Sequence, residues 1–363
     1  MNVNVVRQVA VAVQVGIPVL LHGDPGVGKT SMLRAIARAL GRQLHILELS
    51  LLLPEDIGGI PYVSDGIVRV APPHWLVGIE ENSILLLDDL GAARPATLNA
   101  ALGLILERRA GVHTLPSNTA IVTATNSSSQ YGNADIPLPV LTRMVHVEVA
   151  LDVQAWAEGV IAGFPIPNIP VLPTGWEEHI PTWRARIAAF ARAMGHAHPS
   201  PLGGDEIAEG DHTVPTPRGW YGLGLPLLAA CDATFGNAMW EVAFPLLCGA
   251  VGRGAAAQFR GWVETVKLPT PQELLQGAPL PSRPEEAWAA LAQLAQWAAN
   301  SSELPTVWEG CWEVIVKALS LGAEDIAVPA MRTLAQAGVR NRLRIPTEAL
   351  KRASALLRDI GIL

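Results

Sequence analysis

Residues 23–30 read Gly-Asp-Pro-Gly-Val-Gly-Lys-Thr. The apolar run Val19–His22 comes directly before them and predicts a β-strand, and the pattern over Ser31–Leu40 predicts a helix. A Gly-x-x-x-x-Gly-Lys-Thr sequence between a strand and a helix is typical of a phosphate-binding loop. Gly26 and Gly28 let the backbone curl, so that successive amide N–H groups point at a phosphate. The stretch therefore predicts a nucleoside triphosphate site in an α/β domain.

Two side chains of this loop have separate expected roles. Lys29 is expected to neutralise the β- and γ-phosphate oxygens of ATP, and Thr30 to offer its hydroxyl to Mg²⁺. The amino terminus of the following helix adds its positive dipole. The complete set of predicted nucleotide-binding residues is Gly23, Asp24, Pro25, Gly26, Val27, Gly28, Lys29, Thr30 and Ser31.

A second apolar run, Ile84–Asp88, ends in two neighbouring carboxylates, Asp88 and Asp89. Asp88 is expected to hold Mg²⁺ through its water shell, and Asp89 to orient or deprotonate the attacking water. Two adjacent acids at the end of a buried strand require a cation nearby, because their repulsion and desolvation are otherwise uncompensated. A solvated transition from strand to loop is the alternative interpretation.

A third run, Ala120–Thr125, is followed by Asn126. If this strand lies between the strand that ends at Asp88 and the phosphate-loop strand, Asn126 reaches the γ-phosphate and helps to position water. The alternative is that Asn126 only opens a turn.

Two arginines are candidates for contact with the γ-phosphate. Arg143 precedes the strand Val145–Val149, at an edge where a neighbouring subunit would meet it, and it is expected to act in trans. Arg218 begins a helix in Pro215-Thr-Pro-Arg-Gly-Trp and is expected to fold down onto the nucleotide. An ordinary surface salt bridge is the alternative for each.

The whole chain divides by texture into a strand-rich and a helical part. Its first 150 residues predict a doubly wound parallel α/β domain, with strands at Val19–His22, Leu44–Leu49, Ile84–Asp88, Ala120–Thr125 and Val145–Val149. After Ala150 the predicted elements are helices, at Val153–Ala162, Thr182–Met194, Arg218–Ala230, Ala238–Gly249, Glu285–Ala299, Thr306–Leu319, Ile326–Ala337 and Thr347–Asp359. The predicted divisions are a nucleotide-binding core over 1–150, a helical lid over 151–266, a Pro-rich linker over 267–284 and a C-terminal helical region over 285–363.

The composition narrows the class of protein. The chain has 363 residues with 26 basic and 33 acidic side chains, a formal charge of −7, which disfavours a generic nucleic-acid coat protein. Its three cysteines share no close metal spacing and predict buried small side chains of a reducing compartment. The apolar stretch Val3–Leu21 is interrupted by Arg7, Gln8 and Gln14, too often for a membrane span. A soluble cytoplasmic protein without membrane attachment is expected.

Taken in order, the phosphate loop, Asp88–Asp89, Asn126, Arg143 and Arg218 resemble the AAA+ ATPases and, within them, the MoxR family. The resemblance extends to Leu53-Pro-Glu-Asp-Ile-Gly-Gly, to Pro95–Arg109 with a hairpin over Gly111–Pro116, to the segment Pro139–Glu148 and to Pro217-Arg-Gly-Trp-Tyr. It implies that Lys29 and Thr30 are Walker A residues, Asp88 and Asp89 Walker B, Asn126 sensor one, Arg143 the arginine finger and Arg218 sensor two. One departure is Asp89, where the family usually has Glu.

The resemblance also implies how the protein works. A MoxR-type protein is expected to form a ring, a hexamer, and to act as a chaperone-like ATPase that remodels a protein partner, which in this family is often a von Willebrand factor A-domain protein. Two alternatives stay open. One is a nucleic-acid-acting NTPase related to McrB. Such a protein would need pore loops with basic and aromatic residues, and the hairpin over Gly111–Asn118 offers only His113. The other is a nucleotide-gated scaffold in which Asp89 makes hydrolysis negligible.

Two weaker patterns also have an alternative interpretation. His196-Ala-His198 with Asp205, Glu206, Asp211 and His212 suggests a metal site, but its uneven spacing with Gly and Pro favours a polar loop. Trp308 and Trp312 lie one helical turn apart, and core packing is favoured for them over a partner-binding face.

Overall fold

The computed structural model describes residues 2–126, 136–195, 200–204, 206–301, 304–320, 324–359 and 361. Contacts divide the chain into two units, one made of Met1–Glu177 with Gly203–Ala257 and the other of Glu178–Leu202 with Gln258–Leu363. The first unit holds a β-sheet and the second is helical. Each is described by itself.

The first unit is built on a five-stranded parallel sheet in the order β2-β5-β8-β1-β9. These strands are β1 Val19–His22, β2 Leu44–Glu48, β5 Ile84–Asp88, β8 Ala120–Thr125 and β9 Val145–Glu148. The inner strands are buried on both faces, as continuous apolar runs predict. Strand β8 lies between β5 and β1, which confirms the expected position of the strand that precedes Asn126. The predicted parallel α/β architecture is confirmed.

Helices pack around this sheet. The helices of the strand-rich segment are α1 Val3–Val15, α2 Lys29–Leu40, α3 Pro54–Gly58, α4 His74–Val77, α5 Pro95–Glu107, α6 Leu138–Leu141 and α7 Val153–Ala162, with a short 3₁₀ turn η1 at Leu90–Ala92. Leucines of β2, β5 and α5 form one continuous core, which includes Leu47, Leu85, Leu87 and Leu104. The sheet is thereby held rigid beneath the loops at the carboxyl ends of its strands.

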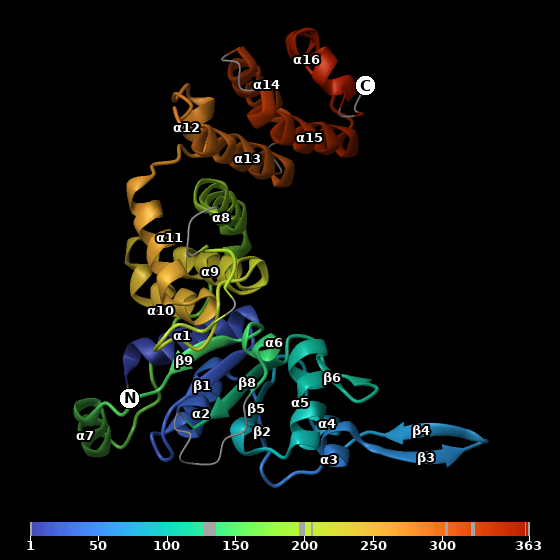
Figure 1. Ribbon diagram of the computed structural model, residues 1–363, viewed down its shortest axis with the longest axis vertical. Coiled ribbons are helices and arrows are strands. Elements are labelled where there is room, and N and C mark those ends of the chain that lie inside the picture. Colours follow the sequence, from blue (N-terminus) through green and yellow to red (C-terminus); the bar gives the residue numbers. More distant parts are fainter. Residues whose placement is uncertain are drawn as a thin grey trace. The chain divides into compact units, whose positions relative to one another are not determined.

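Two hairpins leave the sheet (Figure 1). The pair β6 Arg109–Ala110 and β7 His113–Thr114 was expected after the helix Pro95–Glu107 and is confirmed. The longer pair, β3 Ile60–Ser64 with β4 Ile67–Ala71, was not predicted. Its side chains are mostly exposed on both faces. The alternation of apolar and polar residues that normally indicates a half-buried strand is therefore absent.

The chain returns to the first unit after residue 203. A π-helical turn, η4 at Gly219–Gly224, opens the predicted helix, which continues as α9 Leu225–Phe235. A 3₁₀ turn η5 at Gly236–Ala238 leads to α10 Trp240–Val251. Both α9 and α10 pack against α1, and α10 also packs against β9. The N-terminal helix is therefore enclosed by segments that follow it by more than two hundred residues.

The second unit contains helices only among its described residues. They are α8 Ile180–Met194, the continuation of α11 Arg253–Thr265, α12 Pro271–Leu275, α13 Pro284–Asn300, α14 Leu304–Ser320, α15 Glu324–Asn341 and α16 Thr347–Asp359, preceded by the 3₁₀ turn η3 Trp176–His179. Trp308 and Trp312 lie in its core, where Trp308 Nε1 donates to the Arg344 carbonyl oxygen over 2.8 Å. The expectation that these two tryptophans pack internally is confirmed.

These units differ from the divisions predicted at residues 150, 266 and 284. Residues 151–177 and 203–257 belong with the sheet, and α8, from the middle of the predicted lid, packs on α13. The physical reason is that α9 and α10 bury their apolar faces against α1 and β9. A helical pattern in the sequence predicts that a segment is a helix, but it does not predict which surface that helix packs against.

Other expectations concern the membrane and the cysteines. None of the helices in the described part of the chain is long and apolar enough to cross a bilayer. Cys231 and Cys311 are buried and Cys248 is half-buried. Burial raises the pKa of the Cys311 thiol to about 12 and that of Cys248 to about 11, so both are protonated at neutral pH.

Candidate nucleotide-binding site

The phosphate loop joins β1 to α2 at the carboxyl edge of the sheet. Gly26 and Gly28 have φ angles of 80° and 97°, a left-handed backbone that side chains disfavour. Gly28 is also the N-cap residue of α2, so the free amides of the first helical turn face the space above the loop. The backbone thus forms the anion-binding concavity that the sequence predicts.

Lys29 is held inside this loop by oxygen atoms. Its Nζ donates to the carbonyl oxygens of Gly23 over 2.6 Å and of Asp24 over 3.2 Å, and to Asn126 Oδ1 over 3.2 Å. Burial lowers the pKa of Lys29, while the nearby carboxylates of Asp88, Asp89 and Asp24 oppose that shift. The ammonium group donates its hydrogen bonds to neutral oxygens, and it is therefore well placed to bind a negatively charged phosphate.

Thr30 and Asp88 meet at the same edge. Thr30 Oγ1 donates to Asp88 Oδ2 over 3.0 Å, and the other Asp88 oxygen accepts from the backbone N–H of Asp89 over 3.1 Å. A hydroxyl and a carboxylate oxygen in contact are the ligand types that Mg²⁺ prefers. The donor set therefore fits the ion predicted at Thr30 and Asp88.

Asp89 has an unusual backbone, with φ 55° and ψ 44° in the left-handed region. Asp and Asn adopt this conformation more readily than other side chains that carry a Cβ. The turn aims the chain away from β5 directly after the two carboxylates, and both carboxylates stay half-buried. Backbone strain of this kind gathers at functional sites.

One pocket of about 380 Å³ brings most of the predicted site residues together, but not Gly23, Asp24 or Val27. It is lined by Pro25, Gly26, Gly28, Lys29, Thr30, Ser31, Asp88, Asp89 and Asn126. These residues come from the ends of three neighbouring strands, β1, β5 and β8, as the sequence patterns predict. The two predicted arginines do not line it.

Arg143 lies at the other end of the sheet. Strand β9 pairs with β1 so that Val145 faces Val19 and Glu148 faces His22, next to the phosphate loop. The stretch from Arg143 to Glu148 is about 16 Å long in extended form. Arg143 Nη1 donates to the Pro139 carbonyl oxygen over 2.7 Å. In this conformation Arg143 does not reach its own phosphate pocket, as its expected action in trans requires.

Arg218 lies directly before the π-helical turn η4 and is exposed. It belongs to the same unit as the phosphate loop, but among the described residues it does not line the phosphate pocket. Its predicted contact with the γ-phosphate stays a prediction.

The segment around His196, for which a polar loop was favoured over a metal site, falls partly outside the described residues, which exclude His196, His198 and Asp205. Of the remainder, Asp211 accepts from the backbone N–H of Arg253 over 3.0 Å, and His212 stacks on His22. Among the described residues no group of three His, Cys, Asp or Glu side chains is arranged to hold a metal ion.

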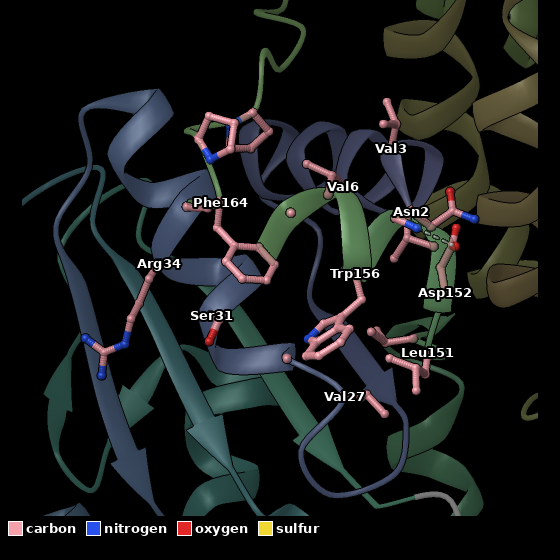
Figure 2. A pocket seen from close by; sticks show the side chains of 18 of the residues that line it. Asn2, Val3, Val6, Val27, Ser31, Arg34, Leu151, Asp152, Trp156 and Phe164 are labelled. Carbon is pink, nitrogen blue, oxygen red and sulfur yellow. Dashed lines mark hydrogen bonds between the residues drawn. The ribbon is translucent and has the colours of Figure 1, made fainter. Parts of the chain in front are cut away.

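Sequence reasoning missed a larger pocket of about 820 Å³ that shares Gly26, Gly28 and Ser31 with the phosphate pocket. Figure 2 shows Trp156, Leu151 and Val27 directed into this space. Trp156 is 54% exposed although it is a large aromatic residue. An apolar pocket beside a phosphate site suits a nucleoside base. Its one signal in the sequence is an aromatic residue shortly after the last strand, at the ligand edge of the sheet.

Replacing Trp156 with alanine is expected to weaken ATP binding about tenfold, because stacking on an aromatic ring contributes about 1–3 kcal/mol per base. Calorimetric titration of ATP and of inorganic triphosphate measures the effect. Trp156→Phe, which keeps an aromatic face, should bind ATP nearly as the parent does. Equal weakening of triphosphate binding would contradict a contact with the base.

Comparison with known proteins agrees with this geometry. The AAA model, described as the ATPase family associated with various cellular activities, matches residues 19–149. The chain is 34% identical to protein MoxR of Methylorubrum extorquens over 28% of this chain and 31% of that protein. It is 38% identical to protein MoxR of Paracoccus denitrificans over 25% of this chain and 27% of that protein. The matched region spans less than a third of the length of these curated relatives.

A solved structure from Cytophaga hutchinsonii, described as a candidate ATPase, is similar with a TM-score of 0.47 and 15% identity, over 72% of this chain and 88% of that chain. Sheet, phosphate loop and family match together define the class: residues 19–149 are an AAA ATPase domain. That domain is also similar to the MoxR proteins, so it is a MoxR-like AAA+ domain.

Proposed function

We propose that this protein hydrolyses Mg·ATP in a ring of identical subunits and uses the energy to remodel a protein partner. The observation that carries the proposal is the convergence of Lys29, Thr30, Asp88, Asp89 and Asn126 on one pocket. A larger pocket suited to a base adjoins it. These two spaces together match the parts of a nucleoside triphosphate.

Lys29 performs the first task, binding. When the phosphates enter, the Nζ atom exchanges its contacts with the Gly23 and Asp24 carbonyls for phosphate oxygens, and the backbone N–H groups of the loop donate hydrogen bonds to other phosphate oxygens. Asn126, which already contacts Lys29, lies where it can orient the γ-phosphate or the attacking water. Mg²⁺ held by Thr30 and Asp88 would neutralise charge on the phosphates.

Asp89 is the candidate base. Its carboxylate is shorter by one methylene than the Glu usual in the family, and a misplacement of ~1 Å can slow a reaction on the order of a hundredfold. The left-handed backbone at Asp89 offers a local explanation for the shorter side chain, because Asp tolerates that conformation well. The shorter side chain of Asp89 favours a second candidate function, a nucleotide-gated scaffold with negligible hydrolysis.

The ring and its partner rest on Arg143 and on the family resemblance. An arginine at the far end of the sheet from its own phosphate loop supports a site completed by the next subunit. A hexamer is the ring we propose. Motion between the nucleotide-binding domain and the helical region would then act on a protein partner, for which we propose the von Willebrand factor A-domain class.

Asp89→Asn tests the proposal directly. The change keeps the size of the side chain and its tolerance of a left-handed backbone, and removes only the base. ATP affinity in a calorimetric titration should change less than about twofold, and turnover should fall on the order of a hundredfold or more, as loss of a general base predicts. Steady-state phosphate release with saturating Mg·ATP is the measurement.

Two comparisons give this test its controls. Asp232→Asn, on α9 and outside the phosphate pocket, should leave turnover unchanged. If the parent protein binds ATP and releases no phosphate at any protein concentration, the scaffold function replaces the remodelling ATPase. If Asp89→Asn hydrolyses as fast as the parent, Asp89 is not the base.

A further inference from the structure

Three histidines from distant parts of the chain form one stack behind the phosphate loop. His22 ends β1, His146 lies in β9, and His212 comes from the loop before η4. The His22 and His212 rings are parallel within 6°, with centroids 3.8 Å apart, and the His146 ring is 5.1 Å from that of His22. His22 and His146 are both buried.

Hydrogen bonds determine which nitrogen of each buried ring carries the proton. His146 Nε2 lies 2.9 Å from the Leu141 carbonyl oxygen, which can only accept, so Nε2 is protonated. His146 Nδ1 is then an acceptor, and His22 Nε2, 2.9 Å away, must donate to it. The result is a directional chain from His22 through His146 to Leu141, in which both rings are neutral.

The charges around the stack favour this neutral form. Burial lowers the pKa of His146 to about 4. Burial, together with the positive charges of His146, His212 and Lys29, lowers the pKa of His22 to about 2. Among the described residues, the carboxylate recorded in contact with the stack is that of Glu148, which accepts from His212 Nε2 at 3.2 Å. The chain of hydrogen bonds therefore persists throughout the neutral pH range.

Each end of the chain adjoins a residue of the nucleotide machinery. His22 directly precedes Gly23, whose carbonyl oxygen accepts a hydrogen bond from the Lys29 ammonium. Leu141 lies two residues before Arg143. Helix α10 packs closely against β9 at His146: a Cβ added at Gly249 would overlap the His146 backbone. Strand β9 is therefore closely packed at His146.

We propose that His22 and His146 are positioning residues that transmit nucleotide occupancy from the phosphate loop to the segment carrying Arg143. The inference rests on the proposed function, in which Arg143 completes the neighbouring site. Binding of the phosphates shifts Gly23 and His22, the shift alters the donor to His146, and the Leu141 carbonyl carries it to the arginine. His212 ties the loop before Arg218 to the same stack.

His146→Phe is the decisive variant, since it preserves ring volume and stacking and removes both hydrogen bonds. ATP affinity should stay within about twofold of the parent, because Lys29 and Thr30 are untouched, while turnover at saturating ATP falls about tenfold. His45→Phe, the same change on β2 outside the stack, is the matched control. A loss of affinity together with a lowered Tm would indicate a merely structural role and overturn the proposal.

A second readout separates this proposal from the proposed function. Amide hydrogen exchange over residues 138–146 should slow when the parent binds a non-hydrolysable ATP analogue, and this response should disappear in His146→Phe while residues 23–31 remain protected. It requires no turnover. Absence of the response in the parent, or its persistence in the variant, would overturn the proposal. In the ATPase assay His146→Phe combined with Arg143→Ala should be no slower than Arg143→Ala alone, and additive losses would contradict the route through Arg143.

Discussion

Replacing Lys29 with alanine is expected to weaken ATP binding on the order of a hundredfold or more, since a charge-assisted hydrogen bond contributes about 1.5–3 kcal/mol and Lys29 makes more than one. Calorimetric titration with Mg·ATP measures the loss. The fold should remain, because Lys29 is a desolvated cation held by two carbonyls and one amide oxygen, and no described residue forms an ion pair with it.

Two variants serve as controls for this experiment. Lys317→Ala removes an exposed lysine of α14 and should leave ATP affinity and Tm as in the parent. Lys29→Met keeps most of the side-chain length without charge and should bind as weakly as Lys29→Ala. Parental affinity in either Lys29 variant would show that the loop at residues 23–30 does not bind the triphosphate.

The second large effect is expected at Arg143. Arginine fingers contribute about 10³–10⁵ to turnover, so Arg143→Ala should reduce phosphate release on the order of a thousandfold while each subunit still binds ATP normally. Specific activity of the parent should also rise with protein concentration, because the charge is supplied only where subunits touch. Arg109→Ala, an exposed arginine of the β6–β7 hairpin, provides a comparison of the same residue type.

Mixing two inactive variants makes the test at Arg143 sharper. In a ring assembled from equal amounts of Arg143→Ala and Lys29→Ala, about one boundary in four joins an intact phosphate loop to an intact arginine, because each interface is head-to-tail. Partial recovery of phosphate release is expected. Mixed rings that form but recover no activity would mean that Arg143 acts within its own subunit or not at all.

Much of the sheet and the phosphate site was accessible from the sequence, because both depend on local patterns. Continuous apolar runs at Val19–His22 and Ile84–Asp88 predict buried parallel strands, and the polar residues that follow them must share the carboxyl edge. The position of Asn126 depends on strand order, and the structure has β8 between β5 and β1, as the sequence analysis assumed. Spacing within a motif carries this information without reference to distant residues.

What the sequence did not reveal depends on contacts between distant segments. The base pocket draws Val6 of α1 and Trp156 of α7 together, and no local pattern links residues so far apart. The β3–β4 hairpin lacks a buried face, so its strands show no alternation. The His22–His146 hydrogen bond joins two neighbouring strands, β1 and β9, and no local sequence motif links these two residues.

The enclosure of α1 by α9 and α10 has a consequence for synthesis on the ribosome. Helix α1 leaves the ribosome roughly 200 residues before its covering helices, a delay of about 10 to 40 s at ordinary translation rates. During that interval the apolar face of α1, which includes Val9 and Val13, lacks two of its native partners, because only α2 and strands β1, β8 and β9 are available to pack on it. Part of this face therefore stays uncovered until Val251 has emerged, and the nucleotide-binding unit is completed only late in translation.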